Sequence, residues 1–379
     1  MKERSEIRNQ LKAIRTRVGL SQQELADAAG VARQTISGVE AGTYAVSVAV
    51  GLRISKALGC PVEELFWLDD DVPLIHANAV SGSVWNASGT RAAVYQVGSQ
   101  WIAHPLSGAS AFRTEMIPAD GIVDEAPFGA SVAVRPLDDA RSLSQGVAIA
   151  GCTPALSLWA RSAQRWYPGL RVHWFHANSM DALGMLSRGE VHAAGLHLYD
   201  KVSRSYNLPF VRQTLPGRPV VLVNLGTWEE GFVTAPGNPK RITCASDLTR
   251  GDVAIANREL GAGSRLLLDD LVADCGASAG DVQGYDRVER SHFNAALAVQ
   301  SGTADACVGI ASVAAAHGLH FEPLRQVRYD LAILKDSLTH EPVRQLISTL
   351  DHRWIRTQLE VAGGYDTSRT GEEVGSSGL

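Results

Sequence analysis

The chain contains 379 residues, of which 45% are hydrophobic and 20% are charged, and its formal net charge is −5. No apolar run approaches the roughly 18 residues of a membrane-spanning helix and no signal peptide is recognisable, so we expect a soluble protein without a membrane partner. The length allows two to three domains, because single hydrophobic cores stop growing near about 250–300 residues. Five scattered cysteines contain no Cys-x-x-Cys pair, which predicts no disulfide framework, no metal site and no cofactor.

Residues 21–40, SQQELADAAGVARQTISGVE, have the pattern of two short helices joined by a glycine turn. Ser21 is a favourable N-cap, and Glu24 three positions later completes a capping box, so a helix is expected to begin near Gln22. Gly30 supplies the positive φ that a sharp turn requires. The segment therefore predicts a helix-turn-helix.

The second helix of this pair, residues 32–40, is expected to place Ile36 and Val39 inward and polar side chains outward. Arginine can donate two hydrogen bonds to guanine, glutamine can pair with adenine, and hydroxyls can bond phosphate. The outward side chains are Arg33, Gln34, Thr35 and Ser37. Double-stranded operator DNA is therefore the expected partner of this helix.

Apolar positions on both sides complete a small helical domain of five helices before Trp67. A preceding helix is indicated by the i, i+4, i+7 spacing of Ile7, Leu11 and Ile14. A following helix is indicated by Val48, Leu52, Ile54 and Leu58. Gly59 would end that helix, and Pro61 suits the first turn of a fifth.

Over about the first 66 residues the chain resembles the Cro/phage-repressor (XRE-type) helix-turn-helix family, with favoured residues at Gln22, Ala26, Gly30 and Ile36. The resemblance implies that Gln22 and Gln34 contact backbone and bases. It also implies further DNA contacts from Arg33, Thr35, Ser37, Thr43 and Tyr44. Gly38 departs from the pattern, since glycine costs about 1 kcal/mol of helix propensity relative to alanine. The alternative interpretation is a helical dimerisation module that does not bind DNA.

Charge separates this region from the remainder. Residues 1–66 contain nine lysines and arginines against seven acidic residues, which leaves 26 against 33 for the rest of the chain. An acidic bulk is expected to face solvent, a partner or a small ligand rather than DNA. Residues 68–142 read as a linker followed by a small strand-rich insert, with a hairpin at 92–103 turning at Gly98 and Ser99.

Residues 143–370 alternate between strand and helix patterns in two successive groups, which predicts an α/β domain with two similar lobes. The loops after the strands should meet at the carboxyl ends of the sheets, where ligands of open α/β sheets bind. Three such loops open helices, and their free N–H groups favour an anion between the lobes. The residues at these helix starts are Cys152, Thr153, Asn178, Ser179, Gly263, Ser264 and Arg265. Ordinary helix capping is the competing explanation for any one of them.

From about 145 to 370 the chain looks like a type II periplasmic-binding-protein fold, in its cytoplasmic form. The segments that carry the resemblance are 151–154, 178–179, 189–197, 263–265, 301–306 and 364–365. The phrase SGTADACVGI, 301–310, is similar to a segment of molybdate- and other oxyanion-binding proteins. The resemblance implies two lobes that close on a small anionic ligand, with molybdate or tungstate as leading candidates. Arg265 could instead indicate a carboxylate, a phosphate or a pterin.

Tyr285 and His292 complete the expected ligand-binding set at the mouth of the cleft, where histidine can donate to an anion. His192 and His197 are five residues apart on an expected strand, so they face opposite sides and cannot share a metal ion. No catalytic motif stands out, which predicts a protein that is not an enzyme. The alternative is a cysteine-dependent redox sensor or enzyme that uses Cys152 at a helix N-terminus.

These features together predict a multidomain chain, with an all-α helix-turn-helix domain at 1–67 and a two-lobed α/β domain at 143–370. The expected protein is a cytoplasmic, one-component transcriptional regulator that responds to a small ligand. We expect a homodimer or higher oligomer, whose recognition helices reach half-sites about one DNA turn apart. The tail at 371–379 is rich in glycine and serine and is expected to be disordered.

Overall fold

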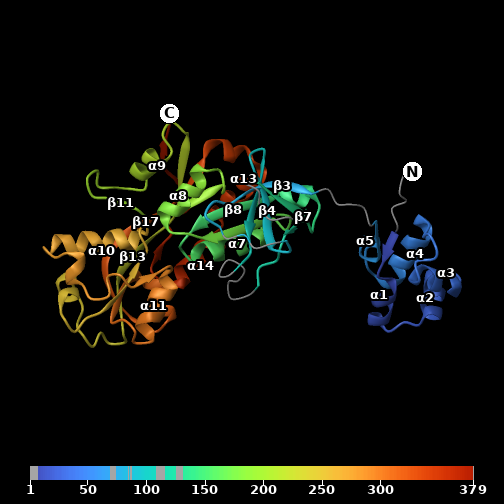
Figure 1. Ribbon diagram of the computed structural model, residues 1–379, viewed down its shortest axis with the longest axis horizontal. Coiled ribbons are helices and arrows are strands. Elements are labelled where there is room, and N and C mark those ends of the chain that lie inside the picture. The colour runs from blue at the N-terminus through green and yellow to red at the C-terminus, as the bar shows by residue number, and fades with distance from the viewer. Residues whose placement is uncertain are drawn as a thin grey trace. The chain divides into compact units, whose positions relative to one another are not determined.

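A computed structural model describes residues 7–68, 74–83, 85, 88–107, 116–124 and 131–378 (Figure 1). The chain divides into two compact units, Met1–Pro73 and Leu74–Leu379. Among the described residues, no helix is both long enough and apolar enough to cross a membrane.

The first unit contains five short helices and a two-stranded antiparallel sheet within residues 7–68. The helices are α1 (Leu11–Val18), α2 (Gln22–Ala29), α3 (Arg33–Glu40), α4 (Val48–Leu58) and α5 (Val62–Leu65). The five expected helices are therefore confirmed. The strands are β1 (Ile7–Asn9) and β2 (Phe66–Leu68), so Ile7 lies in a strand and its assignment to a helix is wrong.

Local sequence explains the turn between α2 and α3. The Ser21 hydroxyl accepts a hydrogen bond from the Glu24 backbone N–H, and the Glu24 carboxylate accepts one from the Ser21 N–H. This is the predicted capping box. Gly30 ends α2 in the left-handed conformation, with φ of 64°. The core of the unit contains Leu11, Ile14, Leu25, Ala26, Ala29, Ile36, Val39, Ile54 and Leu65.

Only two of the four apolar residues of α4 that were expected to face the core do so. Ile54 is fully buried and Leu58 packs at the edge of the core. Val48 and Leu52 are 81% and 57% exposed, so the prediction that they supply the core is wrong. They lie one helical turn apart on the outer face of α4, because a short helix can turn only one stripe toward such a small core.

The second unit begins with a closed β-barrel in the strand order β3-β5-β4-β6-β7. Its strands are β3 (Ile75–Ala79), β4 (Arg91–Val97), β5 (Gln100–Pro105), β6 (Gly121–Val123) and β7 (Ser131–Pro136). The expected hairpin is confirmed as β4 and β5, with Gly98 at positive φ. Residues 69–73 of the expected linker lie outside the described residues. The barrel shares a hydrophobic core with the α/β domain, since Tyr95 and Ile102 pack with Ala148 and Phe175.

The α/β domain is built on one sheet in the order β15-β14-β16-β13-β17-β10-β8-β9. Its first lobe contains α6 (Ala140–Ser144), β8 (Gly146–Gly151), α7 (Ala155–Trp166), β9 (Arg171–His176), α8 (Ser179–Ser187), β10 (Ala193–Leu196), α9 (Leu208–Thr214), α13 (Glu341–Ser348) and α14 (Arg353–Ala362). A short hairpin, β11 (Tyr199–Asp200) and β12 (Ser205–Tyr206), follows β10.

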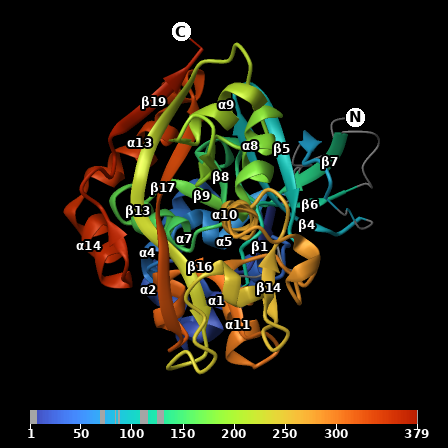
Figure 2. The ribbon, with the colours of Figure 1, turned by 90° about the vertical axis from the view of Figure 1, so that its left-hand side faces the viewer.

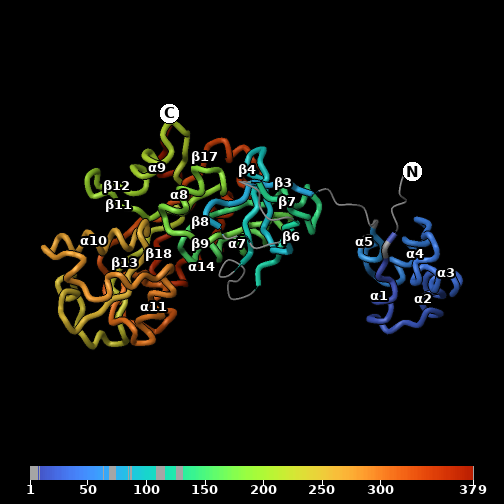
Figure 3. Tube along the Cα trace, in the orientation of Figure 1, coloured from blue at the N-terminus to red at the C-terminus, as the bar shows by residue number. Residues whose placement is uncertain are grey.

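The second lobe, yellow to orange in Figure 3, follows in the chain. It contains β14 (Ile255–Arg258), α10 (Gly263–Asp274), β15 (Val288–Glu289), α11 (His292–Gln300), β16 (Ala306–Ile310) and α12 (Ala311–Ala316). The predicted α/β alternation and the two lobes are thus confirmed. The long β17, by contrast, had no counterpart in the sequence-based assignment.

Helices cover both faces of the first-lobe sheet, and strand β8 shows why. All six of its residues are buried. Val147 and Ile149 belong to a core that includes Trp159 of α7 and Ile355 of α14. Ala148 and its neighbours on the other face belong to the core formed with α8, α9 and the barrel. A continuous apolar run is what a strand buried on both faces requires.

Two long antiparallel strands, β13 (Val220–Thr234) and β17 (His320–Leu334), run side by side through both lobes (Figure 2). Their pairing is interrupted by irregularities between Asn224 and Gly226 and between Glu230 and Gly231. The amino-terminal half of β13 belongs to the first lobe, and its carboxyl-terminal half pairs with β16 of the second. These strands therefore connect the lobes directly.

The carboxyl-terminal segment is ordered as a strand, so the predicted disordered tail is wrong for residues 371–378. Strand β19 (Glu373–Ser377) pairs antiparallel with the first-lobe half of β13, between Val220 and Val223. The shorter β18 (Tyr365–Asp366) pairs with β13 nearer the crossing. Backbone hydrogen bonds hold β19 in the sheet. A composition rich in glycine and serine does not exclude such bonds, because these residues pair through the main chain as others do.

Candidate functional sites: the helix-turn-helix face and the interlobe cleft

The outer face of α3 presents the polar side chains expected to contact DNA. Arg33, Gln34 and Ser37 are exposed, and Thr35 is half-buried. Ile36 points the other way and is fully buried. Helix α3 therefore separates a packing face from a free polar face.

Side chains of α1 and α2 bond to Glu40, the last residue of α3. Arg15 and Glu40 form an ion pair with Nε–Oε1 of 2.5 Å, and the Gln22 amide donates to the same carboxylate at 2.8 Å. The amide nitrogen of Gln22 is thus used within the fold. Thr43 and Tyr44 are both exposed beyond the end of α3, in keeping with the expected phosphate contacts.

The packing of Tyr44 also accounts for Gly38, the residue that departs from the family pattern. A Cβ atom at Gly38 would lie 3.3 Å from the Tyr44 Cβ and 3.7 Å from the Thr43 hydroxyl. Glycine at this position lets the segment after α3 fold back closely on the helix. Glycine at this position therefore avoids a tight contact with Tyr44, although it lowers the helix propensity of α3.

The cleft is organised around His197, which follows β10 and is 2% exposed. Its Nδ1 lies 3.1 Å from the Ser179 hydroxyl and 3.6 Å from the Cys152 sulfur. Its Nε2 lies 3.3 Å from the Glu230 carboxylate, which accepts a hydrogen bond of 2.7 Å from Ser264. His197 and Glu230, which were not among the predicted site residues, thus bring together three that were. These three are Cys152, Ser179 and Ser264, each from a different helix start or helix-opening loop.

The electrostatics of this group are unusual for a buried site. Burial opposes the charged form of His197, but Cys152 and Glu230 outweigh it and raise the pKa of the imidazole to about 10. Glu230 lies on β13 at the lobe crossing and is 1% exposed. A positively charged imidazole beside a carboxylate compensates the cost of burying both groups.

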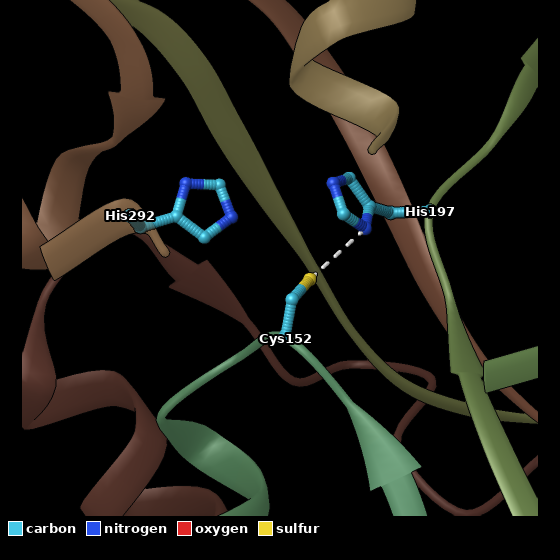
Figure 4. Close-up of side chains that lie close together, drawn as sticks. All are labelled: Cys152, His197 and His292. Carbon is cyan, nitrogen blue, oxygen red and sulfur yellow. Dashed lines mark hydrogen bonds between the residues drawn. The ribbon is translucent and has the colours of Figure 1, made fainter. Parts of the chain in front are cut away.

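His292, the first residue of α11, faces the same cluster from the second lobe and is 1% exposed. Within the described residues, neither ring nitrogen has a hydrogen-bond partner. Burial, together with the charges of Arg258 and His197, lowers the pKa of His292 well below its ordinary value. Figure 4 shows His292, His197 and Cys152 directed toward one another.

The remaining expected residues of the helix starts make contacts that do not leave their side chains free for a ligand. Asn178 caps α8 by accepting from the Asp181 N–H at 2.9 Å, which is the ordinary capping role. Thr153 is buried, with its hydroxyl 3.3 Å from that of Tyr365. Gly263 lies directly against His197, where a Cβ atom would overlap the ring. Gly263 therefore permits the close approach of α10 to the first lobe.

Arg265 and Tyr285 require a different interpretation from the expected one. The Arg265 Nε donates to Asp269 at 3.0 Å, its Nη1 donates to the Arg258 carbonyl, and its guanidinium stacks 4.1 Å from the Tyr285 ring. The Tyr285 hydroxyl also donates to Asp269 at 2.6 Å. Arg265 and Tyr285, both predicted to bind the ligand, are therefore bonded to Asp269 and to each other in this structure.

Arg258, at the end of β14, is the cation that sequence analysis missed. It is 1% exposed, its Nε donates to Glu259 and to the Glu289 carbonyl, and its Nη1 has no partner among the described residues. The only sequence signal was its position at the end of a strand, where α/β sites usually lie. Its Nη2 also donates to Glu259, so the guanidinium forms a bidentate ion pair with that carboxylate and only Nη1 is left without a partner among the described residues.

The lobes are in direct contact around this site. The Met180 N–H of α8 donates to the Gly261 carbonyl at 3.2 Å, and the Asn178 amide donates to the Leu260 carbonyl at 3.3 Å. These bonds join the start of α8 in the first lobe to the loop before α10 in the second. The cleft is therefore closed, with its polar groups removed from solvent.

The fold and these sites define a helix-turn-helix protein with a two-lobed, periplasmic-binding-protein-like domain. The family described as the PBP superfamily domain matches residues 160–351, just over half of the chain, and the helix-turn-helix family matches residues 11–65. The chain therefore belongs to the PBP superfamily domain family and carries a helix-turn-helix domain at its N-terminus.

Two curated relatives are similar to different parts of the chain. The uncharacterized protein YvgK of Bacillus subtilis is 34% identical over 200 residues, covering 52% of this chain and 64% of that protein. The chain thus spans less than two thirds of that relative. The uncharacterized HTH-type transcriptional regulator YgzD of Bacillus subtilis is 38% identical over 65 residues, covering 17% of this chain and 98% of that protein.

A solved structure is similar to part of this chain at low sequence identity. A putative phosphate ABC transporter substrate-binding protein with bound phosphate, from Clostridium perfringens, aligns with a TM-score of 0.44 and 13% identity. The alignment covers 58% of this chain and 99% of that chain.

Proposed function

We propose that this protein is a one-component transcriptional regulator that binds operator DNA through α3 and senses a small anionic ligand in the interlobe cleft. The observation that carries the DNA-binding half is the free polar face of α3, with Arg33, Gln34 and Ser37 exposed over a buried Ile36. Such a face has the donors and acceptors that read base edges in the major groove. The match of residues 11–65 to the helix-turn-helix family supports the same role.

The proposed ligand is an oxyanion, with molybdate or tungstate first and a molybdenum-cofactor-related compound next. Arg258 supports an anion, because its buried Nη1 has no partner in the described chain. The N-terminus of α11 adds the positive end of a helix dipole beside His292. The Glu230 carboxylate would repel an anion, so the ligand is expected on the Arg258 side of the cleft.

The DNA-binding role is tested by fluorescence anisotropy, with the full chain titrated onto duplex DNA from its own upstream region. Arg33→Ala and Gln34→Ala should each weaken binding by about 5- to 150-fold, as expected for losing 1–3 kcal/mol of base recognition. Arg212→Ala removes the same charge from an exposed position on α9 and serves as the control. If the two variants bound the duplex as tightly as the unaltered chain, the proposal that α3 binds operator DNA would be contradicted.

The alternative is a cysteine-dependent redox sensor or enzyme, which one observation favours. Cys152 lies 3.6 Å from the His197 Nδ1, within reach of a base that could hold it as a thiolate. Its sulfur belongs to a side chain that is 2% exposed, so we expect slow modification by iodoacetamide compared with the exposed Cys244. Faster labelling of Cys152 than of Cys244 would support the redox function over the sensor.

A further inference from the structure

Cys152, His197 and His292 form a compact group of potential metal ligands although they are far apart in the sequence (Figure 4). One ligand atom from each lies within 4.8 Å of the other two, and all three residues are buried. They come from the loop after β8, the loop after β10 and the first position of α11. Folding alone brings them together, across 140 residues of chain between the first and the last.

The distance between the first two ligands suits a metal ion. The Cys152 sulfur and His197 Nδ1 are 3.6 Å apart. Tetrahedral coordination with Zn–S of about 2.3 Å and Zn–N of about 2.05 Å requires about 3.6 Å between the same atoms. The ligand atoms of His292 lie within 4.8 Å of the other two, so they exceed the tetrahedral S–N and N–N distances by at most about 1.2 Å and about 1.5 Å, which a side-chain or lobe movement would have to supply.

His292 provides the second, independent observation. It is 1% exposed and both of its ring nitrogens lack partners within the described chain. Leaving a buried polar group unsatisfied costs about 1–3 kcal/mol, so such groups usually serve a purpose. A metal ion between His292 and the other two ligands would satisfy one of its nitrogens.

His197 has the surroundings of a metal-ligating histidine. Its Nε2 faces the Glu230 carboxylate at 3.3 Å while its Nδ1 faces the sulfur. Glu230 is itself oriented by the Ser264 hydroxyl at 2.7 Å. A carboxylate on the outer nitrogen orients the ring and increases its basicity toward a metal ion.

We propose that Cys152, His197 and His292 bind one thiophilic transition-metal ion, with Zn²⁺ as the ion that best suits one thiolate and two imidazoles. This site goes beyond the proposed oxyanion sensing and does not depend on it. Binding would release two protons to solvent, the Nδ1 proton of the His197 imidazolium and the thiol proton of Cys152, so affinity should rise with pH. Three protein ligands leave a fourth coordination position for water or an exogenous group.

The three ligands come from both lobes, so a bound ion would affect how the lobes are held together. Cys152 and His197 belong to the first lobe, whereas His292 belongs to the second. An ion bound by all three would hold the lobes together and favour the closed arrangement over an open one. Metal occupancy is therefore expected to stabilise the second unit against unfolding.

The test uses the full chain, reduced, treated with EDTA and exchanged into metal-free buffer. Titration with Co²⁺, a spectroscopic substitute for Zn²⁺, should give one equivalent of binding with a thiolate-to-cobalt charge-transfer band. Cys152→Ser should abolish the band, and His292→Ala should weaken binding and change the visible spectrum. Glu230→Gln should weaken Zn²⁺ binding by about 10- to 100-fold, because it removes the carboxylate charge 3.3 Å from the His197 Nε2. Thermal unfolding of each variant without metal checks that it folds.

Two matched controls keep the result specific. Cys244→Ser and His76→Ala replace an exposed cysteine and an exposed histidine and should leave the titration unchanged. The proposal is overturned if the unaltered chain shows no thiolate band, or if Cys152→Ser and His292→Ala bind one equivalent as tightly as the unaltered chain. DNA binding measured in EDTA is a separate readout, so loss of the metal site and loss of the regulator function are distinguishable.

Discussion

At the scale of single residues, His192 shows how one side chain joins the barrel to the α/β sheet. The Ala148 backbone N–H donates to its Nδ1 at 3.0 Å, so its Nε2 carries the proton and donates to the Gln96 carbonyl at 2.9 Å. The bond that Nδ1 accepts requires the neutral ring. Burial, helped by the nearby His340, lowers the pKa of His192 to about 3.

This arrangement predicts a loss of stability in acid. The unfolded state, with a histidine pKa near 6.5, binds more protons than the folded state, so the free energy of unfolding falls as pH drops below about 6.5. His192 alone should contribute about 2 kcal/mol of this loss between pH 8 and pH 5. Urea unfolding across this range should show a shallower pH dependence for His192→Asn than for the unaltered chain. Identical slopes would contradict the assignment.

The same scale shows what the sequence could predict in the cleft and what it could not. Ser179 and Ser264 were found because helix starts have a local pattern. His197 and Glu230 were missed, because their roles depend on contacts between distant segments. Arg265 was misassigned although a local signal was present, since Asp269 lies four residues later on the same helix face and is a natural partner.

At the scale of elements, strand periodicity and helix caps predicted the βαβ order, but not the length of β13 or the existence of β17. Strand β13 runs from Val220 to Thr234, through two irregularities and a run that contains Trp228, Glu229 and Glu230. Two adjacent glutamates are not typical of the interior of a strand. Glu230 is accommodated in this strand because it lies at the lobe crossing, where Ser264 donates to its carboxylate and His197 lies beside it.

Strand β19 gives the prediction at this scale. Removing residues after Glu372 should expose the edge of β13 from Val220 to Val223 and lower the midpoint of thermal unfolding of the second unit by several degrees. Ser377→Ala is the control, because the buried Ser377 hydroxyl has no partner in the described residues and β19 retains its backbone. Unchanged thermal stability of the truncated chain would show that β19 contributes nothing.

At the scale of the whole molecule, each of the two units carries one part of the proposed function. The first carries the free polar face of α3, and the second carries a closed cleft that joins both lobes through β13 and β17. A ligand can change DNA affinity only if it binds one state of the protein more tightly than another. The closed contacts between Met180 and Gly261, and between Asn178 and Leu260, are those that lobe opening would break.

The most direct test of the central claim is the DNA affinity of the full chain with and without saturating molybdate at one fixed salt concentration. The coupling expected for an effector predicts a change of about 5- to 150-fold in the dissociation constant, in either direction. Arg258→Gln should reduce that change without altering DNA affinity in the absence of molybdate. An unchanged dissociation constant with molybdate, and equally with tungstate, sulfate and phosphate, would contradict the proposal that this cleft senses an oxyanion.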